Sequence, residues 1–252
     1  MNAPVKILAI NGSHRSEKGF TEIVLKSFLK GAQSANARCE VLYPSGKKIT
    51  PCDSCGKCLF ETPGTCKFRD DMESVIREME TADLIVFSCP VYFDGMPSHM
   101  KKMIERLRST LDAAFEFRNG RTYHLKIRER RQSVVLIFTA GNPERDSFVS
   151  IRRVFNRIAD NMGWQVKGEL DFPASHLLVA EPHRLSGQLE AVTQCGRDIV
   201  TLGEIREEIL AAANKTYVDS PETTLDHMSR MILQMRRDRR EKPAEVQERT
   251  HI

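Results

Sequence analysis

The sequence lacks an apolar run of membrane-spanning length, and it lacks an N-terminal secretion signal. Residues 1–13 carry one lysine and a short apolar stretch that leads directly into a glycine turn, which is typical of a first β-strand. Without a secretion signal, the seven cysteines predict a reducing cytoplasm, where clustered thiols indicate metal or redox chemistry rather than disulfides. We therefore expect a cytoplasmic protein with no membrane partner.

The chain also has little net charge, because 38 Lys and Arg residues against 34 Asp and Glu residues leave only +4. Such a small excess is weak evidence for binding an acidic polymer, and we expect no nucleic-acid partner. Hydrophobic residues make up 40% and charged residues 29% of the 252 residues, which predicts one soluble α/β domain with extensions. The sequence shows no internal repeat and no second catalytic domain.

Neither a Walker loop nor a G-x-G-x-x-G fingerprint follows the first predicted strand, residues 5–10. The loop 11–21 (NGSHRSEKGFT) is instead rich in small hydroxyl residues and leads into a predicted helix at about 21–32. The N–H groups at a helix start, the hydroxyls and the charge of Arg15 all favour an anion, so the loop predicts a phosphate site. An ordinary strand-to-helix turn capped by a serine is the alternative.

Four of the cysteines stand close together in the stretch 51–72, with the spacing C-x2-C-x2-C-x7-C: they are Cys52, Cys55, Cys58 and Cys66. Prolines and glycines in this stretch allow the backbone to curl so that the thiols converge. Three thiols at three-residue steps favour a [4Fe–4S] cluster over zinc, which usually binds two separated C-x2-C pairs. A zinc ion, or reduced thiols without any metal, are the alternatives.

The remaining apolar runs predict four more strands that alternate with helices. The strands are expected at 39–43, 83–88, 133–140 and 165–172, and the helices at about 72–80, 98–111, 145–162 and 187–213. This alternation predicts a doubly wound, five-stranded parallel sheet with helices on both faces. Because ligands of such sheets bind outside the carboxyl ends of the strands, we expect the loops 11–21, 52–66 and 89–97 to lie side by side.

An aromatic loop, a basic run and a C-terminal extension are the other segments with a distinctive composition. The loop 89–97 has two aromatics between prolines and could support a flat ring, although plain packing against the next helix is the alternative. The basic run 118–131 is expected to be solvated surface, with docking of an acidic partner or a cofactor phosphate as the alternative. We divide the chain into a main domain, 1–214, and a helical, basic C-terminal extension, 215–252.

The extension contains a predicted amphipathic helix at 222–235. Its apolar side carries Leu225, Met228, Met231, Ile232 and Met235. A helix lined with methionines more often packs on another element or subunit than on a cofactor. The final ten or so residues are predicted to be disordered.

Three motifs, AINGSHRSEKGFT, CDSCGKC…C…DDM and SCPVYFDGMPSHMKKMIER, resemble those of the NAD(P)H-dependent FMN reductases and especially the iron–sulfur flavoproteins. The resemblance extends from residue 5 to about 205. It implies a flavodoxin-like fold, bound FMN, a redox function and a homodimer or homotetramer. In the cluster-bearing members the cysteines that match Cys52, Cys55, Cys58 and Cys66 ligate [4Fe–4S], near a flavin across the subunit interface.

The resemblance also implies which residues bind the cofactor. The FMN phosphate is held by the loop that contains Ser13, Arg15, Ser16, Gly19, Phe20 and Thr21. The isoalloxazine lies along Pro90, Val91, Tyr92, Phe93 and Gly95. The turn Thr139, Ala140, Gly141 and Asn142 closes the pocket. This chain departs from the family pattern at His14, Phe20 and Cys89, where proline, asparagine and a hydroxyl residue are common.

We therefore expect an FMN-dependent oxidoreductase whose cluster passes single electrons to or from the flavin. NAD(P)H is the expected electron donor, and a ferredoxin or a small-molecule acceptor is the expected redox partner. An NAD(P)H:FMN or quinone reductase without a cluster is the first alternative. A zinc-bound or redox-sensing interaction protein is the second. No side chain is an obvious general acid or base, so the catalytic residues are left unassigned.

Overall fold

A five-stranded parallel sheet forms the centre of the molecule in the computed structural model, which describes residues 3–128, 132–218 and 220–241. Its strands are β1 (Lys6–Asn11), β2 (Arg38–Leu42), β3 (Leu84–Pro90), β6 (Ser133–Thr139) and β7 (Gln165–Phe172). They are arranged in the order β2-β1-β3-β6-β7. This order confirms the predicted flavodoxin-like sheet, and each strand lies where its apolar run indicated.

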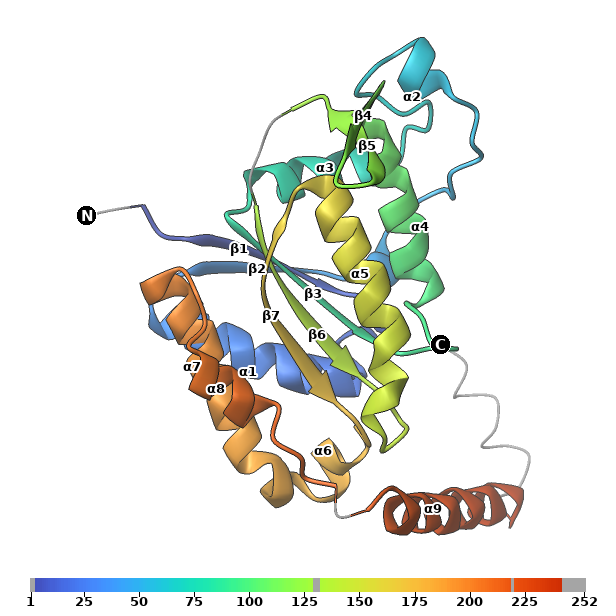
Figure 1. Cartoon of the computed structure of the whole chain (residues 1–252). Helices are drawn as coiled ribbons and strands as arrows, with labels where there is room; N and C mark the ends of the chain where they lie inside the picture. Colours follow the sequence, from blue (N-terminus) through green and yellow to red (C-terminus); the bar gives the residue numbers. More distant parts are fainter. Residues whose placement is uncertain (1–2, 129–131, 219, 242–252) are drawn as a thin grey trace.

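Helices cover both faces of the sheet (Figure 1). One face carries α1 (Phe20–Ser34), α6 (Leu177–Ala180), α7 (Ser186–Leu202) and α8 (Glu207–Ala213). The other carries α3 (Met72–Thr81), α4 (Ser98–Arg106) and α5 (Val149–Met162). Along β1, Ile7 and Ala9 pack on the first face and Leu8 and Ile10 on the second, because successive strand side chains point in opposite directions. Within the described ranges, no helix is both long and apolar enough to span a membrane.

Two glycines bring the backbones of α1 and α7 into direct contact. A Cβ atom on Gly31 would lie 1.7 Å from the carbonyl oxygen of Thr193, and one on Gly196 would lie 1.9 Å from that of Phe28. No side chain fits at either position without moving one helix. The contact is reciprocal, because each helix supplies one glycine and one carbonyl group.

The region after α4 differs from the prediction. The helix expected to reach Leu111 ends at Arg106, and a short 3-10 turn, η3 (Leu107–Thr110), leads into an antiparallel hairpin of β4 (Leu111–Arg118) and β5 (Arg121–Lys126). The described part of the basic run is largely exposed, as expected of solvated surface, but much of it also forms a strand pair that was not predicted. Positive φ angles of 50° at Asn119 and 72° at Gly120 match the two-residue turns that suit hairpins. Residues 129–131 of that run lie outside the described residues.

The hairpin packs on the end of α5 through a tyrosine. Tyr123 is buried, and its hydroxyl donates a hydrogen bond to the carboxylate of Asp160 at 3.0 Å. Arg121 forms an ion pair with the same carboxylate. The hairpin is thus fixed to the main domain at the side opposite to the carboxyl ends of the strands.

The helix predicted at 187–213 is interrupted. Gly203, with a φ of 76°, ends α7 in the left-handed conformation, and α8 starts at Glu207. Beyond α8, Tyr217 is buried in the core beside Phe172, and its hydroxyl donates to the carbonyl oxygen of Pro173. The chain therefore contributes to the core as far as Val218, which is partly buried against the same cluster.

The last helix, α9 (Pro221–Glu241), is longer than the predicted 222–235 and projects from the rest of the structure (Figure 1). Its side chains Leu225, Ile232 and Met235 are exposed by 44, 52 and 46%. The segment 242–252, which includes the residues predicted to be disordered, lies outside the described residues.

We predict that α9 contacts another copy of the chain, since its apolar side chains have little to pack on within the molecule. Removing residues 221–252 leaves Tyr217 in place, so the melting temperature should change little while light scattering reports a smaller assembly. The double variant Leu225→Ser/Ile232→Ser should have the same effect without shortening the chain. An unchanged mass in both variants would show that α9 makes no subunit contact.

Candidate functional site

Loops that follow β1, β3 and β6 meet at the carboxyl edge of the sheet. The Val91 amide donates a hydrogen bond to the carbonyl oxygen of Thr139 at 2.8 Å. The hydroxyls of Thr21 and Thr139 hydrogen-bond to each other, with 2.7 Å between the oxygens. The structure thus brings together one predicted residue from each of the three segments that the sequence assigned to a cofactor.

The loop after β1 has the features of an anion site. Ser13 is 3% exposed, and its hydroxyl oxygen accepts a hydrogen bond from the Arg15 amide at 3.2 Å. A Cβ atom on Gly19 would lie 2.4 Å from that oxygen, so a larger residue there would displace the Ser13 hydroxyl. Helix α1 begins directly after Gly19 without a side-chain cap, which leaves its first N–H groups for a ligand.

A buried polar network between the end of β1, α1 and Tyr43 supports this loop, and it was not predicted from the sequence. Glu22 is 3% exposed and accepts hydrogen bonds from the amide nitrogen of Asn11 at 2.8 Å and the hydroxyl of Tyr43 at 3.0 Å. Burial and the Glu22 carboxylate raise the pKa of Tyr43. The oxygen of Asn11 accepts from the Ser13 amide at 2.9 Å, so the network holds the loop at its first residue. An Asn at a strand end and a Glu in the next helix's first turn are the available sequence signals.

The loop after β3 is a tight, strained turn. Tyr92 and Gly95 exchange backbone hydrogen bonds of 2.9 and 3.0 Å, and Phe93 and Asp94 between them have φ angles of 45° and 58°. Left-handed backbone costs a non-glycine residue roughly 1–2 kcal/mol. The ring of Phe93 is fully exposed, so the alternative of plain packing against the next helix is wrong for this residue. A strained turn that presents a bare aromatic ring is typical of a ligand contact.

The turn after β6 is tied to the neighbouring strand β7. The Ala140 amide donates to the Phe172 carbonyl at 2.9 Å, and the Asn142 carbonyl accepts from the Ala174 amide at 2.8 Å. Gly141 between them is exposed, with no other group within 4 Å of where its Cβ would be. This turn therefore offers open backbone beside the Thr21–Thr139 contact.

The four clustered cysteines lie elsewhere. Helix α2 (Lys57–Phe60), in the middle of their segment, packs against β4 and η3 (Figure 1). The segment is attached to Arg106, the last residue of α4. Arg106 lies about 12 Å along the helix from its first residue, Ser98, which follows the aromatic loop. The expected position beside the phosphate loop is therefore not found within one chain. The segment is long enough to leave the edge of the sheet and follow α4 to its other end.

A buried arginine closes the base of the cysteine segment. Arg106 Nη1 donates to the carbonyl oxygen of Thr50 and to Asp70 Oδ2, each at 2.7 Å, and Nη2 donates to Asp70 Oδ1 at 3.1 Å. Asp70 Oδ2 also accepts from the Thr50 amide at 2.9 Å. The Arg106 side chain is only 1% exposed. The two ends of the segment, at residues 50 and 70, are therefore joined through one guanidinium group.

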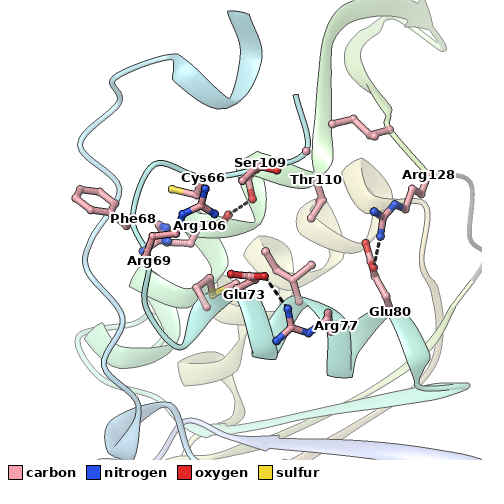
Figure 2. A pocket seen from close by; sticks show the side chains of 15 residues that line it. Cys66, Phe68, Arg69, Glu73, Arg77, Glu80, Arg106, Ser109, Thr110 and Arg128 are labelled. Carbon is pink, nitrogen blue, oxygen red and sulfur yellow. Dashed lines mark hydrogen bonds and ion pairs between the residues drawn. The ribbon is translucent and has the colours of Figure 1, made fainter. Parts of the chain in front are cut away.

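Cys66 lies beside this guanidinium, at the rim of a cavity of about 260 Å³ (Figure 2). Burial by itself disfavours the charge of Arg106, but Asp70 and Cys66 raise its pKa above the ordinary value. Burial raises the pKa of Cys58; the charge of Arg108 opposes this rise, and Cys66, Cys52 and Cys55 add to it. The other three thiols are thus close enough to Cys58 to influence its charge.

The cysteine segment meets one of two requirements for a metal cluster. Its four free thiols are suitable ligands. Within the part of the chain that the structure describes, the buried Nε of Arg106 has no hydrogen-bond partner, so it could donate to an anionic group held by the segment. Among those same residues, however, no three His, Cys, Asp or Glu side chains are close enough to hold a metal ion. The chemistry of the donors fits a cluster, and their arrangement in this structure does not.

The sheet order and the three converging loops define a flavodoxin-like protein with a candidate anion site beside an aromatic turn. Residues 5–150 match the family model of the NADPH-dependent FMN reductases, and the chain belongs to that family. An iron–sulfur flavoprotein of Methanocaldococcus jannaschii is 31% identical over 115 residues, which are 46% of this chain and 58% of that protein. The match thus spans less than two thirds of this relative.

Solved structures with the same fold are more distant in sequence. An NAD(P)H:quinone oxidoreductase from Methanothermobacter marburgensis has a TM-score of 0.59 and 15% identity, over 78% of this chain and 98% of its own. An FMN-dependent NADH-azoreductase from Bacillus anthracis, in complex with FMN, has a TM-score of 0.56 and 15% identity, over 78% and 100%. These likenesses show the fold.

We predict that the strain at residues 93–94 is retained for ligand binding. The variant Phe93→Asn/Asp94→Gly has the residues that this turn prefers, so its free energy of unfolding should rise by about 1–2 kcal/mol. The same variant should bind FMN more weakly, because the exposed ring is lost. Asp94→Gly alone relieves strain and keeps the ring, and it should bind FMN as the wild type does. A double variant less stable than the wild type would contradict the prediction.

We predict that the Arg106–Asp70 pair stabilises the protein in a pH-dependent way. Burial alone would raise the pKa of Asp70, but the hydrogen bonds from Arg106 and from the Thr50 and Met72 amides lower it to about 2. An unfolded Asp has a pKa of about 3.9, so the stabilisation is complete above that pH and is lost as the pH falls through about 2.

The variant Asp70→Asn should therefore cost about 3–5 kcal/mol at pH 7, measured by urea unfolding. The difference in melting temperature from the wild type should shrink between about pH 4 and pH 2. Glu73→Gln is the matched control, because Glu73 pairs with Arg77 at 2.7 Å on the exposed surface. Its cost should be about 0.5 kcal/mol or less. Equal effects of the two variants would show that the buried pair has no special role.

Proposed function

We propose that this chain is an FMN-dependent oxidoreductase that takes electrons from NAD(P)H. Membership of the FMN reductase family supports this, and so does one observation above all. At the uncapped start of α1, Ser13 and Gly19 pack against each other, and the Thr21 hydroxyl hydrogen-bonds to that of Thr139 in β6. The Thr139 carbonyl oxygen accepts in turn from the Val91 amide, in the loop that carries the exposed Phe93. A phosphate site at one end and an aromatic surface at the other suit a phosphorylated cofactor with a flat ring.

In this proposal, each loop has a defined task. The hydroxyl of Ser13, the first N–H groups of α1 and the charge of Arg15 bind the phosphate. Tyr92, Phe93 and the backbone at Gly95 lie along the ring system, and the turn 139–142 closes the pocket. When bound, FMN converts between two-electron donors and one-electron carriers. The residues of this chain bind and orient it.

The cysteine segment adds a finer proposal. We propose that Cys52, Cys55, Cys58 and Cys66 are the ligand set of a [4Fe–4S] cluster, with Arg106 holding the two ends of their segment. The name of the M. jannaschii relative and the donor set support this. A reductase without a cluster is the second candidate, favoured by the lack of a metal-holding group among residues 3–128, 132–218 and 220–241.

The remaining expectations also stay proposals. We propose a homodimer or homotetramer, for which the exposed apolar side of α9 is the support. The redox partner is a ferredoxin or a small-molecule acceptor, and the cytoplasm is the expected location. Neither a membrane nor a nucleic acid is expected as a partner.

Purification without oxygen, followed by FMN, iron and sulfide analysis, tests both levels of the proposal. Wild-type protein should contain FMN and about four iron and four sulfide per chain. Cys66→Ser should lose iron and sulfide together and keep FMN, because the phosphate loop is a separate structure. Cys39→Ser is the matched control, since Cys39 is also half-buried but lies in β2, away from the segment.

The possible results separate the candidates. FMN without iron in the wild type would support the reductase without a cluster. Zinc without sulfide would replace the cluster with a structural metal site. A protein that binds no FMN at all would contradict the main proposal.

A further inference from the structure

Three rings from three different elements meet at the edge of the phosphate loop. The imidazole of His14 lies 5.2 Å from the ring of Tyr92 and 4.8 Å from the imidazole of His99, measured between ring centroids. His14 belongs to the loop after β1, Tyr92 to the loop after β3, and His99 to the first turn of α4. The proposed function uses neither histidine.

The surroundings of this pair disfavour two positive charges. Arg15 follows His14 in its own loop, and Lys102 approaches from α4. Burial first, and then His14 and Lys102, lower the pKa of His99. Tyr92 provides an uncharged ring, and the exposed Asp94 of the same turn is the nearest acid in the sequence. Two imidazolium groups in ring contact repel each other, so both rings carry a charge together readily only when an anion lies beside them.

The position of His14 identifies such an anion. It stands between Ser13 and Arg15, in the loop proposed to hold the phosphate. We propose that His14 and His99 form a proton-linked contact for the phosphate of FMN, so that binding of FMN draws a proton onto this pair. The inference rests on the proposed function and adds a pH dependence to it that the loop alone does not supply.

The direction of the pH dependence follows from the coupling of FMN binding to proton uptake. A proton taken up on binding makes FMN affinity rise as the pH falls, by up to tenfold per pH unit for one full proton. The phosphate itself gains a proton near pH 6, which acts on every variant alike. The contribution of the histidines is therefore the difference in the pH dependence of FMN affinity between the wild type and the histidine variants, measured between about pH 8 and pH 6.5.

Titration calorimetry of flavin-free protein, in buffers with different ionisation enthalpies, counts the protons taken up on binding. We expect His14→Gln, His99→Gln and the double variant to lose the same proton uptake, because the pair acts as one unit. His183→Gln should match the wild type, since that exposed histidine lies in the turn 182–185, before α7. Riboflavin, which lacks the phosphate, should bind with the same small uptake in all proteins.

Two results would overturn the inference while leaving FMN binding intact. One is equal proton uptake with FMN in the wild type and in His14→Gln. The other is an equally large loss of uptake with riboflavin, which would assign the proton to contacts with the ring system. A wild type that binds no FMN would overturn the proposed function as well, so the two failures are distinguishable.

Discussion

The pairing of β1 with a neighbour on each side is the constraint on which the rest of the structure depends. Ile7 is paired with Cys39 of β2 on one side and with Leu84 of β3 on the other, and parallel pairing continues to the carboxyl ends. The Gly12 amide extends this pairing by donating to Ser88 at 2.7 Å. Since parallel strands all end at one edge, the loops that follow β1 and β3 must lie next to each other. The short Thr21–Thr139 contact then adds β6 to the same edge.

The cysteine segment depends on a different interaction. A buried guanidinium joins residues 50 and 70 at the far end of α4, and the β4–β5 hairpin packs beside the segment between them. The candidate site therefore has two parts that are held in different ways, one by the backbone of the sheet and one by a buried charge. A change in acidity that neutralises Asp70 should loosen the second part before the first.

The sequence predicted the sheet because five apolar runs alternate with amphipathic ones, and this pattern has few stable arrangements. It also predicted that the loops of Ser13 and Phe93 lie at the same edge of the sheet, because their positions follow from strand order. Arg106 could not be predicted, because it lies next to the apolar stripe of Met100, Met103 and Leu107 and has partners far away in the sequence. The hairpin could have been predicted, because Asn119-Gly120 is a strong turn signal. The dense charge around these two residues favoured an interpretation as solvated surface instead.

The glycine contact between α1 and α7 has a consequence for how a ligand is received. The backbones of the two helices touch at Gly31 and Gly196, so a movement that brings them closer drives a carbonyl oxygen into a Cα atom. The position of α1 on the sheet is therefore set by this backbone contact before any anion arrives. A preorganised receptor loses little conformational entropy on binding, because its ordering is completed during folding. Selection against larger side chains at two positions remote from the site would then act on cofactor retention as well as on stability.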